Sequence, residues 1–210
     1  MSSDITATTV EGSIVSGVFD PASTTFIAAA ARPTGAFTLA NTFFPSVNAD
    51  TARRLSVTTT GTGDNNKTVT IVGLDLNNKT ITDIITSTGS AATVDGVRFF
   101  KKIVSATCSA QYAANVSVGI TDLATSSLLT GRTRLKAFTT ISNAASTRIE
   151  FINGTAPADD GAEAVFVTRT SGVANAADDV YIPDEGVLFT NNLMLQFNVS
   201  GAKMVTAFHA

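Results

Sequence analysis

Three adjacent pairs of acidic residues are the first places in this sequence where chemistry could occur. They are Asp159–Asp160, Asp178–Asp179 and Asp184–Glu185. Paired carboxylates can act as general acid and base or hydrolyse glycosides, and they bind Ca²⁺ when oxygen ligands alternate around a glycine bend. None of these pairs has the spacing of a calcium loop, so the sequence predicts polar turns at all three. A polysaccharide hydrolase whose acids come from distant strands is the alternative.

The chain holds one histidine and one cysteine, His209 and Cys108. A Ser or Thr nucleophile needs an activating base, but His209 is the penultimate residue and has no obvious partner. We therefore expect a solvated or interface histidine. Cys108 ends an apolar run and is predicted to be a small buried hydrophobe rather than a reactive thiol. With no multi-cysteine zinc site and no glycine-rich phosphate loop, the sequence predicts no enzyme activity, no metal, no cofactor and no small-molecule substrate.

The 210-residue chain carries little charge. Charged residues make up 15% of it, against about 25% in a typical domain, and 44% of residues are hydrophobic, which excludes disorder as the main state. The net charge of −3 argues against a nucleic-acid partner. The basic pairs Arg53–Arg54 and Lys101–Lys102 are predicted to be surface or subunit contacts. Burying uncharged polar groups costs less than burying charges, so this composition suits a subunit covered by other subunits.

No segment of the sequence is expected to enter a membrane. The longest apolar run, residues 26–31, is far shorter than the roughly 20 residues that a membrane-spanning helix needs. The N-terminus has no basic region before an apolar core, so we expect no signal peptide.

The first segment, residues 1–54, has no regular apolar period. Three of the five prolines, Pro21, Pro33 and Pro45, lie in it, and each interrupts a regular element. We expect an irregular N-terminal arm that packs on a neighbouring molecule. The alternative is a set of short edge strands in the chain's own domain.

The remaining chain alternates between apolar and polar residues at the period of a β-strand. Runs of this kind recur at about ten-residue spacing, separated by turn signals such as Asn77–Asn78 and Asn153–Gly154, which is typical of antiparallel sandwiches or barrels. We predict an all-β fold with two small antiparallel sandwich-like or barrel-like modules, residues 55–130 and 131–210.

Two groups of segments resemble β modules that recur in structural proteins of tailed bacteriophages. The first group is Val69–Ile85, Phe99–Val104 and Asn115–Gly119, with a Gly-x-Asp turn and a closing Val-x-Val-Gly strand. A second group is similar to small β domains of the same class; it comprises Arg148–Gly154, Ile182–Phe189 and Leu193–Phe208. In such virions these modules belong to head decoration (cement) proteins or to tail components.

The resemblance implies a non-enzymatic structural protein located in a virion. We expect a homotrimeric capsid decoration protein that binds and stabilises the lattice of the major capsid protein through an arm of residues 1–45. The predicted partner-interface anchors are Phe26, Phe37, Phe43 and Phe44, each worth roughly 1.5–3 kcal/mol if fully covered. A tail, neck or fibre component, acting as an adaptor or receptor-binding module, is the alternative.

Overall fold

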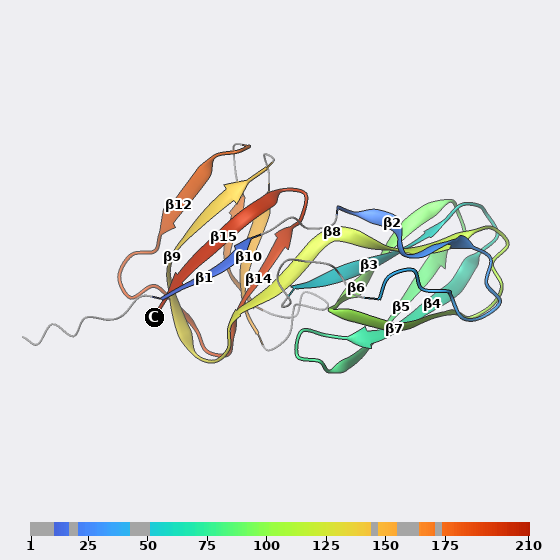
Figure 1. Ribbon diagram of the computed structural model, residues 1–210, viewed down its shortest axis with the longest axis horizontal. Coiled ribbons are helices and arrows are strands. Elements are labelled where there is room, and N and C mark those ends of the chain that lie inside the picture. The colour runs from blue at the N-terminus through green and yellow to red at the C-terminus, as the bar shows by residue number, and fades with distance from the viewer. Residues whose placement is uncertain (1–10, 17–20, 43–50, 144–146, 155–163, 171–173) are drawn as a thin grey trace, which may run out of the picture.

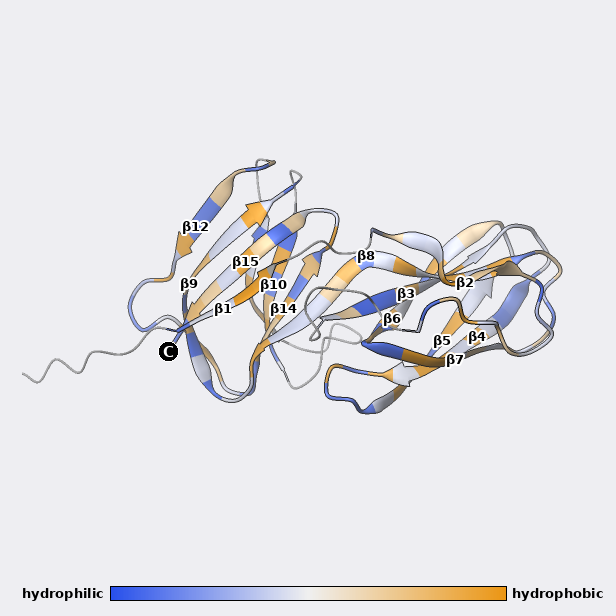
Figure 2. Ribbon diagram, in the orientation of Figure 1, coloured by the Kyte–Doolittle hydropathy of each residue, from blue (hydrophilic) through white to orange (hydrophobic). Residues whose placement is uncertain are grey.

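The computed structural model describes residues 11–16, 21–42, 51–143, 147–154, 164–170 and 174–210. These residues form fifteen strands and no helix, hence no helix that could cross a membrane. The strands build two β-sandwiches that lie side by side along the long axis of the molecule (Figure 1). Along many strands hydrophobic residues alternate with hydrophilic ones (Figure 2), as burial of one sheet face requires.

One sandwich contains the C-terminal half of the chain together with the first strand. Its first sheet has the order β1 (Glu11–Ser16), β15 (Ala202–His209), β9 (Thr133–Ser142) and β12 (Ala177–Tyr181), and β13 (Val187–Phe189) also pairs with β9. The opposite layer is formed by β11 (Ala164–Thr170), β10 (Arg148–Asn153), β14 (Leu193–Asn198) and part of β8 (Val116–Leu129). Between the layers, the rings of Phe138 and Phe151 lie 4.9 Å apart. We call this unit the C-module.

The other sandwich, which we call the N-module, also consists of two β layers. One layer contains β2 (Ser23–Ala31), the first part of β8, β3 (Thr51–Thr59) and β6 (Ala92–Phe100). The second layer has the order β5 (Thr80–Thr88), β4 (Asn65–Leu74) and β7 (Lys102–Cys108). Its core is a continuous cluster of buried aliphatic and aromatic side chains from both layers.

Strand β8 belongs to both modules. Strand β3 pairs with almost the whole length of β8, from Val116 opposite Thr59 to Ser126 opposite Thr51. On its other side β8 pairs first with β2 and then with β14. One seven-stranded sheet therefore runs through both sandwiches, so the backbone hydrogen bonds of that sheet fix one module against the other.

A separate apolar cluster also joins the modules. Leu76, in the turn after β4, and Phe99 of β6 come from the N-module, while Ile152 of β10 and Met194 of β14 come from the C-module. All four are less than a tenth exposed. The modules thus share both a sheet and a small core.

The structure confirms the predicted all-β fold of antiparallel, sandwich-like modules. The expected turn at Asn77–Asn78 is present, with Asn78 at a φ of 60°. The module boundary predicted at residue 130 does not separate the two modules completely, because β8, which precedes it, contributes to both of them.

The predicted arm, residues 1–54, is different in the structure. It contains two strands of the chain's own sheets, since β1 pairs with β15 and β2 pairs with β8. Pro21 precedes β2 and Pro33 follows it, so these prolines delimit a strand rather than interrupt one. Pro45 lies outside the described residues.

We predict that Gly119→Ala destabilises the fold. Gly119 lies in β8, where an added Cβ would collide with the backbone of Ser23 and Thr24 in β2. Overpacking against backbone costs about 1–3 kcal/mol, and urea titration followed by circular dichroism measures the loss.

The matched control is Gly35→Ala, because a Cβ at Gly35 meets no atom within 4 Å. The control should stay within about 0.5 kcal/mol of the wild type. Equal stability of the two variants would contradict the close packing of β2 on β8.

Candidate interaction surface

The phenylalanines predicted as partner anchors have other roles where the structure describes them. Phe37 is 8% exposed and belongs to the N-module core, and Phe26 is partly buried against the same core. The prediction for Phe37 is wrong because its segment runs beside β7 of the same chain. The Phe37 N–H donates to the Ala106 carbonyl over 2.9 Å, and the Phe37 side chain packs in the N-module core. Phe43 and Phe44 lie outside the described residues.

His209 is buried, contrary to the prediction of a solvated or interface histidine. Its Nε2 lies 2.8 Å from Ser13 Oγ of β1, and that hydroxyl also donates to the Leu128 carbonyl of β8 over 3.2 Å. Which atom donates in the Ser13–His209 bond depends on the tautomer of the imidazole. With either tautomer, the contacts of Ser13 fasten β1 to β15 and β8.

The acidic pairs occupy different places in the C-module. Asp178 pairs with Arg169 at 2.6 Å, and Asp179 accepts from Thr139 Oγ1 at 2.6 Å. Both lie in strand β12, so the turn predicted for them is wrong. The Asp184–Glu185 pair does lie in a turn, with Asp184 at a φ of 57°. The pair at 159–160 lies outside the described residues.

The remaining polar candidates are used inside the fold. Cys108 is buried as predicted, with its Sγ 3.2 Å from the carbonyls of Pro33 and Gly35. Arg53 is 2% exposed and donates to the Thr121 carbonyl, so it is not the surface contact that the sequence predicted. Within the described residues no group of three or more His, Cys, Asp or Glu could hold a metal ion.

The outward face of the sheet β1-β15-β9-β12 is the most unusual surface that the structure describes. Val15, Val205 and Phe138 point into the C-module core, so their neighbours along the strands point outward. Three rows of outward residues cross the sheet through paired positions. The apolar side chains in these rows are Ile14, Met204, Phe208, Ala137, Ile141, Ala177 and Tyr181.

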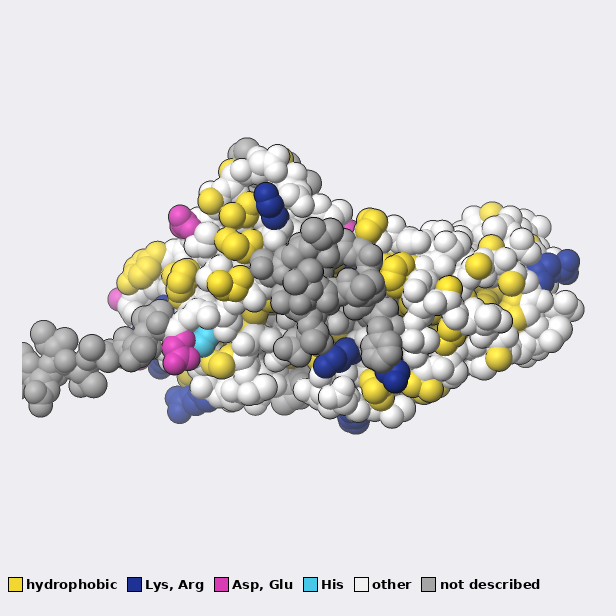
Figure 3. Space-filling view, viewed as in Figure 1, with side chains coloured by type: hydrophobic (Ala, Val, Ile, Leu, Met, Phe, Trp, Pro, Cys, Tyr) yellow, Lys and Arg dark blue, Asp and Glu magenta, His cyan; other side chains and the backbone are white. Residues whose placement is uncertain are grey.

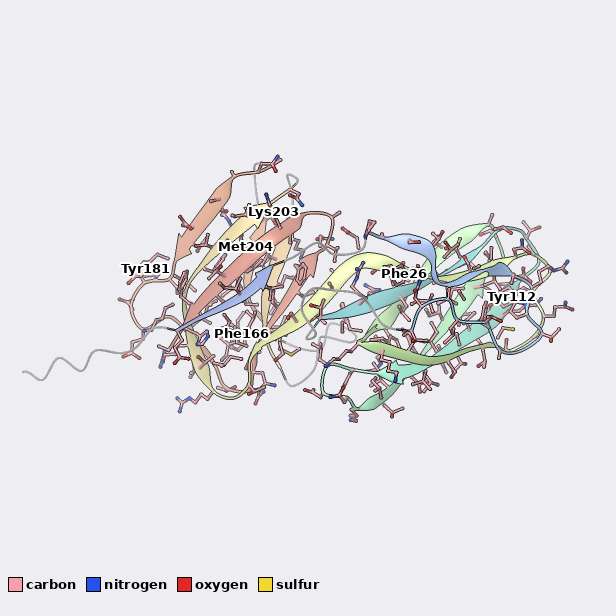
Figure 4. All side chains as sticks on the ribbon, viewed as in Figure 1. Phe26, Tyr112, Phe166, Tyr181, Lys203 and Met204 are labelled. Atoms are coloured by element: carbon pink, nitrogen blue, oxygen red, sulfur yellow. The ribbon has the colours of Figure 1, made fainter. Side chains whose placement is uncertain are left out.

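These rows carry almost no charge. Among their described residues Asp179 is the one charged side chain, and Thr139 already donates a hydrogen bond to it. Lys203 lies at a register shift at the end of the rows. Ile14 is 59% and Tyr181 is 76% exposed, and hydrophobic side chains gather over this sheet in the space-filling view (Figure 3). Tyr181 and Met204 belong to this surface (Figure 4), which we call the apolar face.

The second layer of the N-module provides an internal comparison. The outward residues of β5 are Thr80, Thr82, Ile84, Thr86 and Thr88. On this strand a single exposed isoleucine lies among threonines, and on β7 of the same layer Val104 is the exposed apolar residue, as expected of an antiparallel sheet with one solvated side. The apolar face departs from that pattern, and exposed apolar patches mark interaction sites.

Sequence analysis missed the apolar face although a signal was present. In β15 the outward Met204 and Phe208 alternate with the inward Val205 and Ala207. Apolar residues on both sides of one strand, with Thr206 between Met204 and Phe208 on the outward side, are a pattern that a sheet with one solvated side does not need.

Among the buried charged groups of the N-module, Asp64 has the network with the most donors that the structure describes. Asp64 is 0% exposed and accepts from Lys67 Nζ at 2.8 Å, from the Ala113 N–H at 2.6 Å and from the Ala114 N–H at 3.2 Å. Burial raises the pKa of this carboxyl. The three hydrogen bonds and the Lys67 charge lower the pKa by more than burial raises it, so the pKa of Asp64 lies below its ordinary value of 3.8. This network holds the loop before β8 against the start of β4.

No protein-family model matches this sequence, and no curated protein or solved structure matches it either.

We predict that Asp64→Asn lowers the melting temperature at neutral pH. A carboxyl whose pKa is lower in the folded state contributes stability above its unfolded pKa, and that contribution is lost as the pH falls through the folded value. The difference in melting temperature between wild type and variant should therefore shrink as the pH drops below 3.8.

Scanning calorimetry at several pH values measures this difference, with Asp95→Asn, an exposed carboxylate of β6, as the control. A difference that stays constant from neutral pH to acid would show that the Asp64 network contributes no charge-dependent stability.

Proposed function

We propose that this chain is a non-enzymatic structural protein of a tailed-phage virion, and that it acts as a capsid decoration protein on the lattice of the major capsid protein. The resemblance of its β segments to phage structural modules supports the virion location. The single observation that carries the binding role is the apolar face, because a large uncharged sheet surface can be covered by a partner at little desolvation cost.

The proposed mechanism is mechanical. The shared sheet makes the two modules one stiff body, so a contact made by the C-module holds the N-module in place as well. A ligand that binds only the native lattice stabilises that lattice by mass action. The proposed homotrimer follows from the symmetry of capsid sites, at which closed rotational assemblies are favoured.

The binding surface in this proposal differs from the phenylalanine anchors of the sequence analysis. Phe37 contributes to the chain's own core, whereas Ile14 and Tyr181 of the apolar face are exposed by more than half. Covering each of these two side chains is worth roughly 1.5–3 kcal/mol when burial is complete.

A tail, neck or fibre role would use the same face, and copy number separates the two roles. The protein is mixed with purified empty heads, and separately with tails, of the phage that encodes it, and the bound protein per particle is quantified. We expect hundreds of copies on heads. A few copies on tails or at a single vertex would overturn the decoration role and support the adaptor.

We predict that Ile14→Thr combined with Tyr181→Ser weakens particle binding at least tenfold, since a loss of about 1.4 kcal/mol is enough for that change. Ile84→Thr is the matched control, because Ile84 is 61% exposed and lies outside the apolar face. Quantitative pelleting with particles measures the binding, and melting temperatures verify that all variants are folded. Equal binding of the double variant and the control would remove the apolar face from the interface.

A further inference from the structure

A cleft of about 440 Å³ opens at one edge of the N-module. It lies between the end of β2 and the segment that follows it. Its lining includes Ala29, Ala31, Arg32, Ala36, Phe37 and Thr38. Small side chains therefore form the walls, and a single cation is found among the described lining residues.

The cleft exists because two antiparallel segments separate. They are joined where the Ala40 N–H donates to the Ile27 carbonyl over 2.8 Å. Beyond that point the second segment lies beside β7 instead. The Phe37 N–H donates to the Ala106 carbonyl, and the Cys108 N–H donates to the Gly35 carbonyl. Among the described residues no hydrogen bond joins 28–31 to 36–39, positions that a continued hairpin would pair.

An open strand edge of this kind accepts an extended chain. Peptides add to exposed edges through main-chain hydrogen bonds, and pockets beside the edge select side chains. Because half of the lining residues are alanines, they leave room for an inserted segment with side chains of moderate size.

Arg32 gives the cleft its charge preference. It is exposed, and its Nε donates to the Tyr112 carbonyl at 3.1 Å. Tyr112 is fully buried, so this bond orients the guanidinium. Since the fork carries five N–H donors, four remain for an acceptor such as a carboxylate. The cleft therefore fits an extended segment that has small or β-branched residues and one acidic residue.

We propose that the occupant is the N-terminal segment, residues 1–10, of a second copy of this chain. Asp4 is the one charged side chain in that segment, and Ile5, Val10 and four other residues that are Thr or Ala surround it in sequence. Fully extended, ten residues reach about 33–36 Å. The inference rests on the proposed function in that it treats the chain as a subunit of an assembly.

The position of β1 explains why the donor is a second copy. In its own chain the segment precedes β1, which is paired with β15 in the C-module. The cleft lies in the other module, beside Tyr112, and Tyr112 and Tyr181 lie at opposite ends of the molecule (Figures 1 and 4). A donor segment at one end and an acceptor cleft toward the other make a heterologous contact, which closes into rings or continues as filaments.

The test uses charge reversal in the full chain and sedimentation velocity over a range of concentrations. Arg32→Glu blocks the cleft and Asp4→Lys blocks the segment, so each alone should raise the concentration of half-association at least tenfold. The double variant should associate again. An equal mixture of the two single variants should also associate again, because each contact between unlike variants then joins a segment and a cleft of opposite charge. Arg132→Glu, an exposed arginine of the C-module, is the control for net charge and should associate like the wild type.

Three results would overturn the proposal. The first is a wild type that stays monomeric at every concentration. A segment that bound the cleft of its own chain would give the same result and would also overturn the proposal. The second is association that is unaffected by Arg32→Glu and Asp4→Lys but abolished by Ile14→Thr with Tyr181→Ser, which assigns the contact to the apolar face. The third is a double variant that fails to recover. Since no virion is needed, these outcomes are independent of whether the protein binds heads or tails.

Discussion

The pairing of β3 along strand β8 is the interaction on which the rest of the structure depends. Antiparallel hydrogen bonds run from the Val116–Thr59 pair to the Ser126–Thr51 pair, so a single ladder crosses from one sandwich to the other. The cluster around Phe99 and Met194 then buries the corner that this shared sheet creates. Without that ladder the two modules would be separate small sandwiches joined by loops. With it, a force or a contact on one module acts on both, which is the property a scaffolding or cementing subunit requires.

Low charge has different consequences on different surfaces of this framework. On strand β5 of the N-module the outward uncharged residues are mostly threonines, which water solvates well. On the outer layer of the C-module they include Met204, Phe208 and Tyr181, which water solvates poorly. The same composition therefore gives one face suited to solvent and one suited to a partner. A few charged groups are buried, and the three donors around the carboxylate of Asp64 show what the fold needs in order to keep a charge inside.

The residue types best able to do chemistry stabilise the fold in the part of the chain that the structure describes. Ser13 and His209 hold the first strand to the last, Cys108 lies against two carbonyls, and Asp178 is paired with Arg169. Each contact commits a proton or a lone pair that catalysis would need. The properties left for function are surfaces and edges: an apolar sheet face on one module and an open strand edge beside Arg32 on the other. Both suit contacts between large molecules, which agrees with the proposed structural role.

The sequence alone determined the class of the fold and many of the strands after residue 54, but not β1, β2 or β12. Alternation with a period of two residues, punctuated by Asn77–Asn78 and similar turns, was enough to predict an all-β chain in two antiparallel modules, because strand and turn preferences act within a few residues. Only the tertiary structure decided which strands are neighbours. Period-two patterns do not state their partners, so the pairing of β1 with β15, the double role of β8 and the burial of Phe37 were not predictable. The apolar face depends on the same decision, since Ile14, Met204 and Tyr181 are far apart in sequence and become one surface only when four strands align.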